Sequence, residues 1–320
     1  MRVLVTGSNG FLGTRITADA HDRGWQVIGL GRATAPSSNV DAYVRHDLSA
    51  PVPADAVPGP VDAVVHCAAL ASPWARTREF VAANVDGTRH VVQWATAHGA
   101  PPLVHVSSTS VLYRDEDQLD LTEDSPVPPD DEQINVYSRT KRISERIVAR
   151  YPGRWAVLRP RAVFGVGDTV LLPRILRLAE RGVLPVLEPK GGPHVRMDLT
   201  DVHTAAHFIT EAVARQVSGT YHLTNAEPVD LYPFLLGILA RLGARPRTVH
   251  VPPAAVRTVA RAGELASAAF FDWREPPLTR FGVSVLSRSK TFDVSRTLRD
   301  LGAPAVPLDE AVDRLVRAHG

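Results

Sequence analysis

Thr6-Gly7-Ser8-Asn9-Gly10-Phe11-Leu12-Gly13 stands near the start of the chain, directly after the apolar run Val3-Leu4-Val5. This order predicts a strand, a glycine turn and a helix, because Ile16 and Ala20 continue the apolar pattern at helical spacing. The glycines follow the spacing G-x-x-G-x-x-G, which lets a dinucleotide pyrophosphate approach bare backbone at a helix N-terminus. The stretch therefore predicts a dinucleotide site with these candidate cofactor-binding residues: Gly7, Asn9, Gly10, Phe11, Leu12 and Gly13.

The composition is that of an ordinary globular protein. The 320 residues are 44% hydrophobic and 22% charged, and the formal net charge of +2 does not predict nucleic-acid binding. The single cysteine, Cys67, excludes an internal disulfide framework and favours a reducing compartment. The first predicted strand begins at residue 2, which argues against a signal peptide, and no apolar run approaches the roughly 18 residues of a membrane span. We therefore expect a soluble cytoplasmic protein with no membrane partner and no metal site.

Apolar runs and helical patterns alternate through the first half of the chain. This alternation favours an α/β fold with a Rossmann-type, doubly wound parallel sheet, in a dinucleotide-binding domain over residues 1–160. The predicted strands are 2–6, 25–30, 41–46 (the weakest), 61–66, 102–107 and 154–159. The predicted helices between them are 11–22, 76–98 and 135–151.

The second half of the chain is less regular. Residues 161–320 are expected to form mainly a smaller C-terminal substrate-binding subdomain, interleaved with late elements of the sheet. Segment 115–132, rich in carboxylates and prolines, is expected to be a surface loop. Helices are predicted near 168–182, 200–215, 230–243, 253–267 and 307–318.

Tyr137 and Lys141 stand four residues apart on a predicted helix, so they share one face. A cation beside a phenol stabilises the phenolate and lowers its pKa, which would make Tyr137 usable as a general acid or base. A hydroxyl-rich turn, Ser107-Ser108-Thr109-Ser110, follows the strand predicted at 102–107. Ligands bind at the carboxyl ends of strands in open α/β sheets, so Ser108 is a candidate to hold a substrate oxygen.

Together these motifs resemble the extended short-chain dehydrogenase/reductase family, also called the NAD-dependent epimerase/dehydratase family. The resemblance covers nearly the whole chain and includes Asp47-Leu48, His66-Cys67-Ala68-Ala69, Asn84-Val85-Asp86-Gly87-Thr88 and Leu158-Arg159-Pro160-Arg161-Ala162-Val163-Phe164-Gly165. It implies that Ser108, Tyr137 and Lys141 are catalytic and that Asn84 is structural. It also implies a homodimer formed through the helices at 76–98 and 135–151.

The same resemblance implies further cofactor contacts. Asp47 and Leu48 would contact the adenine, and Ala68 would line the nicotinamide side. Tyr137 and Lys141 would also lie at the cofactor, with Lys141 holding the nicotinamide ribose. Pro160 and Val163 would frame the carboxamide through their backbone.

The end of the second predicted strand bears on the choice of cofactor. NAD-preferring folds place an acid there to bind the ribose 2′-hydroxyl, but this chain has Gly31 followed by Arg32. A missing carboxylate removes repulsion against a 2′-phosphate, and a guanidinium can pair with that phosphate. Alternatively, Arg32 stacks on the adenine or is simply solvated. We expect NADP(H) in preference to NAD(H).

Three reactions are compatible with this resemblance. Dehydration is discounted because the Thr-Asp-Glu of that branch is replaced by Ser108-Thr109-Ser110. The diphosphate-gripping Arg of the nucleotide-sugar epimerases would fall on His194 or Met197, although Arg196 lies between them. The segments 159–174 and 276–302 look like the 3β-hydroxysteroid dehydrogenase-like branch, whose members oxidise secondary alcohols or reduce ketones on apolar substrates.

The resulting hypothesis is an oxidoreductase that interconverts a ketone and a secondary alcohol on an apolar, steroid-like or 3-oxoacyl-like small molecule. Tyr137 would serve as the acid or base of the hydride transfer. The alternative enzyme is a nucleotide-sugar epimerase with tightly held NAD. A non-catalytic NADP-sensing regulator is a third interpretation, although such proteins tend to lose the Tyr or the Lys, and both are present here.

Overall fold

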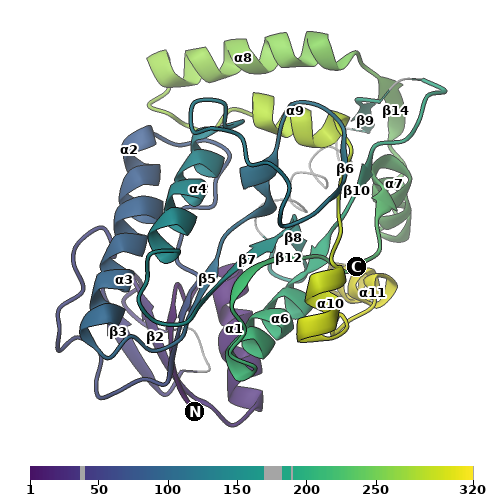
Figure 1. Cartoon of the computed structure of the whole chain (residues 1–320). Helices are drawn as coiled ribbons and strands as arrows, with labels where there is room; N and C mark the ends of the chain where they lie inside the picture. Colours follow the sequence, from purple (N-terminus) through teal and green to yellow (C-terminus); the bar gives the residue numbers. More distant parts are fainter. Residues whose placement is uncertain (37–39, 169–181, 189, 320) are drawn as a thin grey trace.

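A seven-stranded, entirely parallel sheet forms the centre of the molecule in the computed structural model, which describes residues 1–36, 40–168, 182–188 and 190–319. Its strand order is β12-β7-β5-β4-β1-β2-β3 (Figure 1). The strands are β1 (Arg2–Thr6), β2 (Gln26–Gly31), β3 (Ala42–Arg45), β4 (Ala63–His66), β5 (Leu103–Val106), β7 (Trp155–Pro160) and β12 (Gly219–Leu223). The doubly wound parallel sheet predicted from the sequence is confirmed.

The order of the strands reverses direction at β1. From β1 the chain moves to β2 and β3 on one side, and then crosses to β4, β5 and β7 on the other. Ligands bind outside the carboxyl ends of the strands at such a switch point. The glycine turn follows β1 and Ser108 follows β5, so the topology brings both to this edge of the sheet.

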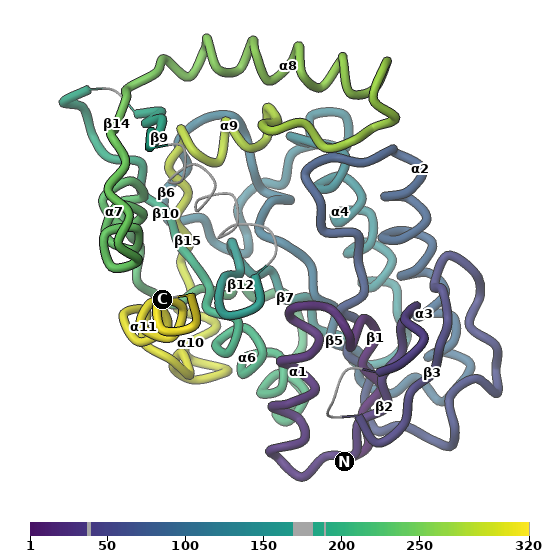
Figure 2. Tube along the Cα trace, turned by 180° about the vertical axis from the view of Figure 1, so that it is seen from behind, coloured from purple at the N-terminus to yellow at the C-terminus, as the bar shows by residue number. Residues whose placement is uncertain are grey.

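Helices cover both faces of the sheet. On one face, α1 (Phe11–Asp22) packs against α6 (Val202–Ala214), and the views of Figures 1 and 2 agree that these two helices lie side by side. On the other face, α3 (Gly87–Ala97) packs against α4 (Val136–Val148). Apolar residues of the strands alternate between the two layers; Val3 and Val5 belong to the α1/α6 core, whereas Leu4 belongs to the α3/α4 core.

The single helix predicted at 76–98 is divided. It consists of α2 (Thr77–Phe80), a π-helical segment (Val81–Asp86) and α3. Within the π-helical segment, buried Asn84 accepts a hydrogen bond from Leu70 N (2.7 Å) and donates one to Thr140 Oγ1 (3.1 Å). Asn84 thus ties the segment after β4 to α4, the bridging role that the resemblance implied.

A second group of elements lies beyond the carboxyl edge of the sheet. It contains a four-stranded sheet in the order β13-β10-β15-β6 and two strand pairs, β8 with β11 and β9 with β14. The strands are β6 (Gln118–Leu121), β8 (Val163–Phe164), β9 (Val183–Val186), β10 (Arg196–Met197), β11 (Thr200–Asp201), β13 (Val229–Asp230), β14 (Arg247–His250) and β15 (Lys290–Phe292). The helices of this group are α7 (Leu231–Arg241), α8 (Pro253–Phe270), α9 (Arg280–Ser287) and α11 (Leu308–His319). Helix α10 (Ser295–Leu301) packs instead on the central sheet, beside β12 and α6. Figure 1 shows α8 across the top of the molecule, above α9.

In this half, the structure corrects one prediction and does not describe the residues of another. The segment 115–132 is not only a loop, because β6 lies within it and pairs with β15, with Leu121 packed beside buried Phe292. The helix predicted near 168–182 falls almost entirely outside the described residues.

Length and apolar character together decide whether a helix could cross a bilayer. Among the described residues, no helix is both long enough and apolar enough to cross a bilayer.

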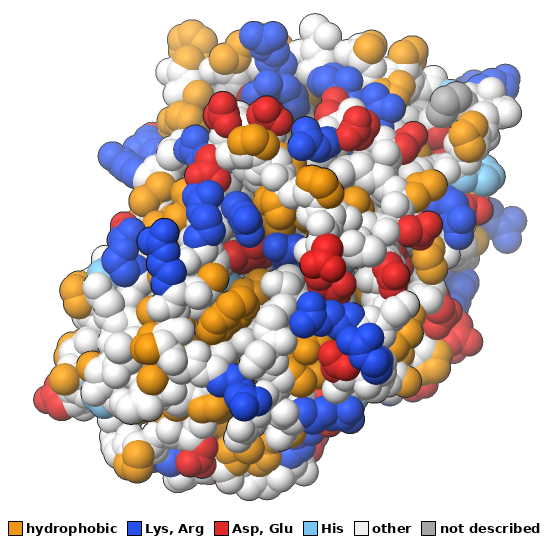
Figure 3. All heavy atoms as spheres, viewed as in Figure 1, with side chains coloured by type: hydrophobic (Ala, Val, Ile, Leu, Met, Phe, Trp, Pro, Cys, Tyr) orange, Lys and Arg blue, Asp and Glu red, His pale blue; other side chains and the backbone are white. Residues whose placement is uncertain are grey.

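Positive and negative side chains are interspersed over the face seen in Figure 3.

Candidate active site

The glycine turn between β1 and α1 leaves no space for a side chain at Gly7 or at Gly13. Gly7 has a left-handed backbone (φ 71°), and a Cβ there would lie 2.8 Å from backbone atoms of Ala68. A Cβ on Gly13 would lie 2.0 Å from Gly7 O. Gly10 precedes α1 and has no side chain to cap it, so the first N–H groups of the helix remain available for an anion. This cradle fits a dinucleotide pyrophosphate.

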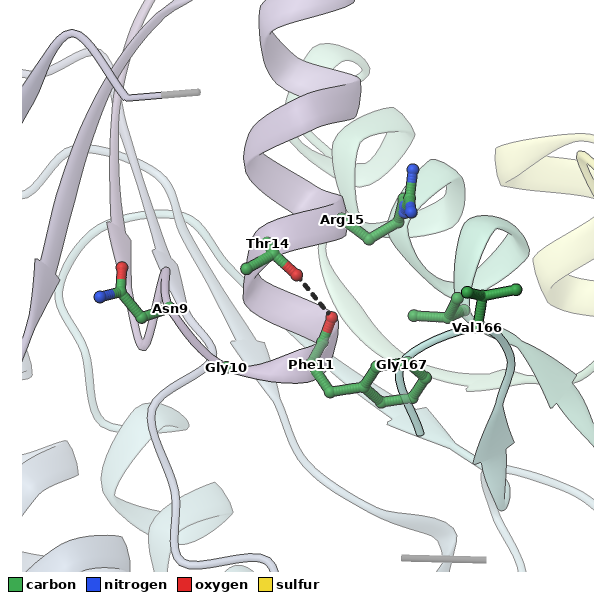
Figure 4. A pocket seen from close by; sticks show the side chains of 8 residues that line it. Asn9, Gly10, Phe11, Thr14, Arg15, Val166 and Gly167 are labelled. Carbon is green, nitrogen blue, oxygen red and sulfur yellow. Dashed lines mark hydrogen bonds between the residues drawn. The ribbon is translucent and has the colours of Figure 1, made fainter. Parts of the chain in front are cut away.

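A cavity of about 420 Å³ opens at the start of α1. In Figure 4, Asn9 and Phe11 lie on either side of Gly10, and Phe11 is directed toward Gly167. Asn9 Nδ2 donates to Ala35 O (2.8 Å), and Thr14 Oγ1 donates to Phe11 O (3.0 Å), so the turn is fixed from both ends. The lining residues are Asn9, Gly10, Phe11, Thr14, Arg15, Val166, Gly167 and Val202.

Ser108 and Tyr137 meet at the carboxyl end of β5. Ser108 begins a short 3₁₀ turn, where its Oγ accepts from Ser110 N (3.2 Å). Tyr137 lies in the first turn of α4, which Asn135 caps by accepting from Ser138 N (2.8 Å). The Ser108 side chain lies close enough to Tyr137 to lower the pKa of its phenol, while Ser108 Oγ itself donates to Ser110 Oγ (3.0 Å). The two hydroxyls that the sequence singled out therefore share one site.

The pKa of Tyr137 differs from the sequence-based expectation. Burial raises it to about 12, and the neighbouring Ser108 side chain opposes that rise. The lowering expected from Lys141 is not found, because the ammonium group is directed elsewhere: Lys141 Nζ donates to Val106 O (2.7 Å) and lies 3.5 Å from His105 Nε2. In this geometry Tyr137 is a protonated donor at neutral pH.

Lys141 itself is strongly affected by its surroundings. Only 1% of the residue is exposed, and burial lowers its pKa to about 8, against the attraction of Glu145. Near pH 7 the group still carries most of its charge, one turn along α4 from Tyr137.

Behind Lys141, Glu145 forms a buried junction that the sequence analysis missed. It accepts from Ser107 Oγ (2.6 Å) and from Arg159 Nε and Nη2 (both 2.8 Å). The Arg159 guanidinium is the main reason that the pKa of Glu145 is lowered despite burial. These bonds join β5, β7 and α4, and they fix the helix that carries Tyr137 and Lys141. The spacing of Glu145 four residues after Lys141 could have indicated it.

At the far end of the site, residues after β2 and β3 line an open cavity of about 450 Å³; they are Arg32, Arg45, His46 and Asp47. A hydrogen bond from Ser49 N is the main cause that lowers the pKa of Asp47, and Arg32 contributes. Leu48 is buried in the core of the α3/α4 layer and does not line this cavity.

The remaining candidate cofactor residues lie along the same edge of the sheet. Ala68 N donates to Thr6 Oγ1 (3.3 Å), beside the glycine turn. Pro160 ends β7, and Val163 lies in β8, paired with Thr200 of β11. Among the described residues, no group of three or more His, Cys, Asp or Glu could hold a metal ion.

Trp74 and His194, whose roles the sequence left open, both contact other side chains of the protein. Trp74 stacks on Trp273 at 5.2 Å between ring centroids and donates to Ser267 Oγ (3.0 Å), which ties it to α8. His194 lies 2.9 Å from Glu188 Oε1, and this carboxylate raises the histidine pKa.

Comparison with known proteins assigns the chain to a family. The model of the NAD dependent epimerase/dehydratase family matches residues 3–224. The chain belongs to this family. The assignment made from the motifs is confirmed, and with it the conclusion that the chain is an enzyme.

Named relatives of this epimerase/dehydratase family member include oxidoreductases. It is 32% identical over 330 residues to the 2-alkyl-3-oxoalkanoate reductase of Stenotrophomonas maltophilia (strain K279a), with 98% of each chain covered. It is 29% identical over 322 residues to the 3 beta-hydroxysteroid dehydrogenase/Delta 5-->4-isomerase of Mycobacterium tuberculosis (strain CDC 1551 / Oshkosh), with 94% of this chain and 85% of the relative covered.

Solved structures share the fold at lower identity. The UDP-glucose 4-epimerase of Thermus thermophilus in complex with NAD has a TM-score of 0.73 and 21% identity, covering 100% of this chain and 98% of that one. The epimerase/dehydratase family member thus has the family's architecture over its whole length.

Proposed function

We propose that this enzyme reduces a ketone to a secondary alcohol, reversibly, on an apolar small molecule, with NADP(H) as co-substrate. The observation that carries the proposal is the placement of the Ser108 and Tyr137 side chains beside one another at the carboxyl edge of the sheet, with buried Lys141 one turn behind. The names of the Stenotrophomonas reductase and the mycobacterial dehydrogenase support this class of substrate.

The proposed mechanism uses the two hydroxyls on one substrate oxygen. Ser108 and Tyr137 donate hydrogen bonds to the carbonyl oxygen and stabilise the negative charge that develops on it. The nicotinamide, when bound, supplies the hydride to the carbonyl carbon. Tyr137 then transfers its phenolic proton to the oxygen and regains a proton from solvent before the next turnover. Lys141, whose ammonium is held by Val106 O, would act by holding the nicotinamide ribose. A tyrosine with a pKa of about 12 is protonated at neutral pH, so it holds the proton that reduction consumes.

The preference for NADP(H) is supported by charge. Gly31 ends β2 where an acid would repel a 2′-phosphate. The adjoining cavity is lined by two arginines and one carboxylate, Arg32, Arg45 and Asp47, together with His46. Neither Arg32 nor Arg45 forms an ion pair with any residue that the structure describes.

The alternative activity is that of an epimerase. Such an enzyme needs a cation for the substrate diphosphate, and Arg196 is the nearest candidate in the sequence. Its guanidinium is 3.9 Å from Asp230 at the surface, in a pair between β10 and β13. An exposed pair at this distance is weak, so Arg196 does not by itself decide between the two reactions, and reduction is preferred on the names of the relatives.

The test of the substrate class uses NADPH deuterated at C4 and two sets of ketones, 2-alkyl-3-oxoalkanoates and 3-oxosteroids. The proposal expects deuterium on the new carbinol carbon of at least one set, detected by mass spectrometry. Loss of NADPH with no labelled alcohol in either set would contradict it.

A further inference from the structure

Two glycines of β2 leave a space that a tyrosine of β3 fills. Gly29 and Gly31 are two residues apart in the strand, so they present the same face, and Gly29 pairs in register with Tyr43. A Cβ on Gly29 would lie 3.1 Å from Tyr43 Cδ2, and a Cβ on Gly31 would lie 2.9 Å from Tyr43 Oη. The tyrosine ring therefore runs along the strand toward the position of the missing acid.

The Tyr43 hydroxyl ends in that position. It is shielded from solvent, and it forms no hydrogen bond with any residue that the structure describes. An unpaired buried hydroxyl is costly, and phenylalanine would fill the same space without that cost. The Tyr43 hydroxyl would have a hydrogen-bond acceptor if a bound ligand supplied one.

The surroundings indicate what kind of group that is. His46 N donates to Gly31 O (2.9 Å), so Gly31 adjoins the cavity lined by Arg32, Arg45, His46 and Asp47. The two guanidinium groups outweigh the one carboxylate in this lining. The acceptor beside a hydroxyl donor and two guanidinium groups should be an anion.

We propose that Tyr43 is a residue that determines cofactor specificity, with its hydroxyl donating to a 2′-phosphate oxygen of NADP(H). The ring occupies the volume that a carboxylate at position 31 would need, so the site gains a donor for phosphate where NAD-specific folds have an acceptor for the 2′-hydroxyl. This inference rests on the proposed preference for NADP(H).

Binding of NADPH and NADH to the nucleotide-free protein, measured by calorimetry, tests the inference without any substrate. Tyr43→Phe should weaken NADPH about tenfold, the effect of losing a hydrogen bond to a charged group, and change NADH less than twofold. Tyr221→Phe, on β12 at the opposite edge of the sheet, is the matched control and should change neither. An equal loss for both nucleotides, or no loss, would overturn the role of Tyr43.

A second pair of variants tests the steric part. Gly31→Asp alone should not create tight NADH binding, because Tyr43 Oη occupies the carboxylate position. Gly31→Asp combined with Tyr43→Ala should bind NADH at least tenfold more tightly than the single variant does. Equal NADH binding by the single and double variants would contradict the steric argument.

The wild-type protein separates this inference from the proposed function. If wild type binds NADH more tightly than NADPH, the proposed cofactor preference is wrong. If wild type prefers NADPH and Tyr43→Phe leaves that preference unchanged, only the role of Tyr43 is wrong.

Discussion

At the scale of single residues, Tyr137 is the group on which the proposed reaction depends. Tyr137→Phe removes the proton donor but keeps the ring that packs near Phe80. We expect kcat to fall by roughly 10²–10⁴-fold, the usual contribution of general acid catalysis, while the Kd for NADPH changes little. Steady-state kinetics and calorimetry measure the two quantities. A variant that keeps more than a tenth of wild-type kcat would contradict the assignment.

Lys141 gives a prediction about stability and pH. Its pKa is about 8 in the folded protein and 10.5 ordinarily, so between these values the unfolded chain binds more protons than the folded one. The free energy of unfolding should therefore rise with pH in this window, by about 2–3 kcal/mol between pH 7 and pH 10 for this group alone. Urea unfolding of wild type and Lys141→Met at several pH values isolates the effect. Parallel pH dependences for the two proteins would show that Lys141 does not titrate in this way.

The sequence predicted which residues lie at the site but not how the Lys141 side chain is directed. The positions of Ser108, Tyr137 and Lys141 followed from short motifs, because spacing on a helix and the end of a strand are local properties. The direction of the lysine is not local: its ammonium is bound by Val106 O. Burial therefore dominates the pKa of Tyr137, which is raised and not lowered.

At the scale of elements, the buried Glu145 holds three of them together. Glu145→Gln leaves the Arg159 guanidinium buried with a neutral partner, and breaking a buried pair costs about 3–5 kcal/mol. Urea unfolding should show a loss of this size, together with a lower kcat because α4 loses its anchor. The control is Glu310→Gln in the exposed pair with Arg314, which should cost less than about 1 kcal/mol. Similar losses for the two variants would contradict the role given to Glu145.

The turn between β1 and α1 gives a prediction with an internal control. Gly13→Ala places a Cβ 2.0 Å from Gly7 O, so the turn must distort, and we expect nucleotide binding to fall below detection. Gly237→Ala in α7 meets no atom within 4 Å and should instead stabilise its helix by about 0.5–1 kcal/mol. Calorimetric titration and thermal unfolding provide the readouts. Nucleotide binding by Gly13→Ala at wild-type strength would contradict the cradle described here.

The elements that could not be predicted from the sequence are those whose formation depends on residues far away in the chain or that have no local sequence signal. Strand β6 forms because residues 118–121 pair with β15, which lies far along the chain, and the surrounding carboxylates and prolines hide its short alternating pattern. The π-helical segment at 81–86 keeps helical composition, so no local signal separates it from α2 and α3.

At the scale of the whole molecule, the family and the parallel sheet could be predicted because the glycine turn, the alternation of strands and helices, and the Ser108 and Tyr137/Lys141 motifs all agree. The choice between reduction and epimerisation could not be predicted from the fold. It depends on whether the nicotinamide nucleotide leaves after each turnover or remains bound, and both behaviours are compatible with one fold.

The most direct measurement is therefore of the nucleotide itself. The purified protein is denatured, any released nucleotide is identified by mass, and the rate at which added NADPH exchanges with native protein is followed. A reductase that uses NADP(H) as co-substrate should have an empty site, or NADP(H) that exchanges within seconds. Stoichiometric NAD⁺ that does not exchange would contradict the proposed function and would identify an internal hydride cycle.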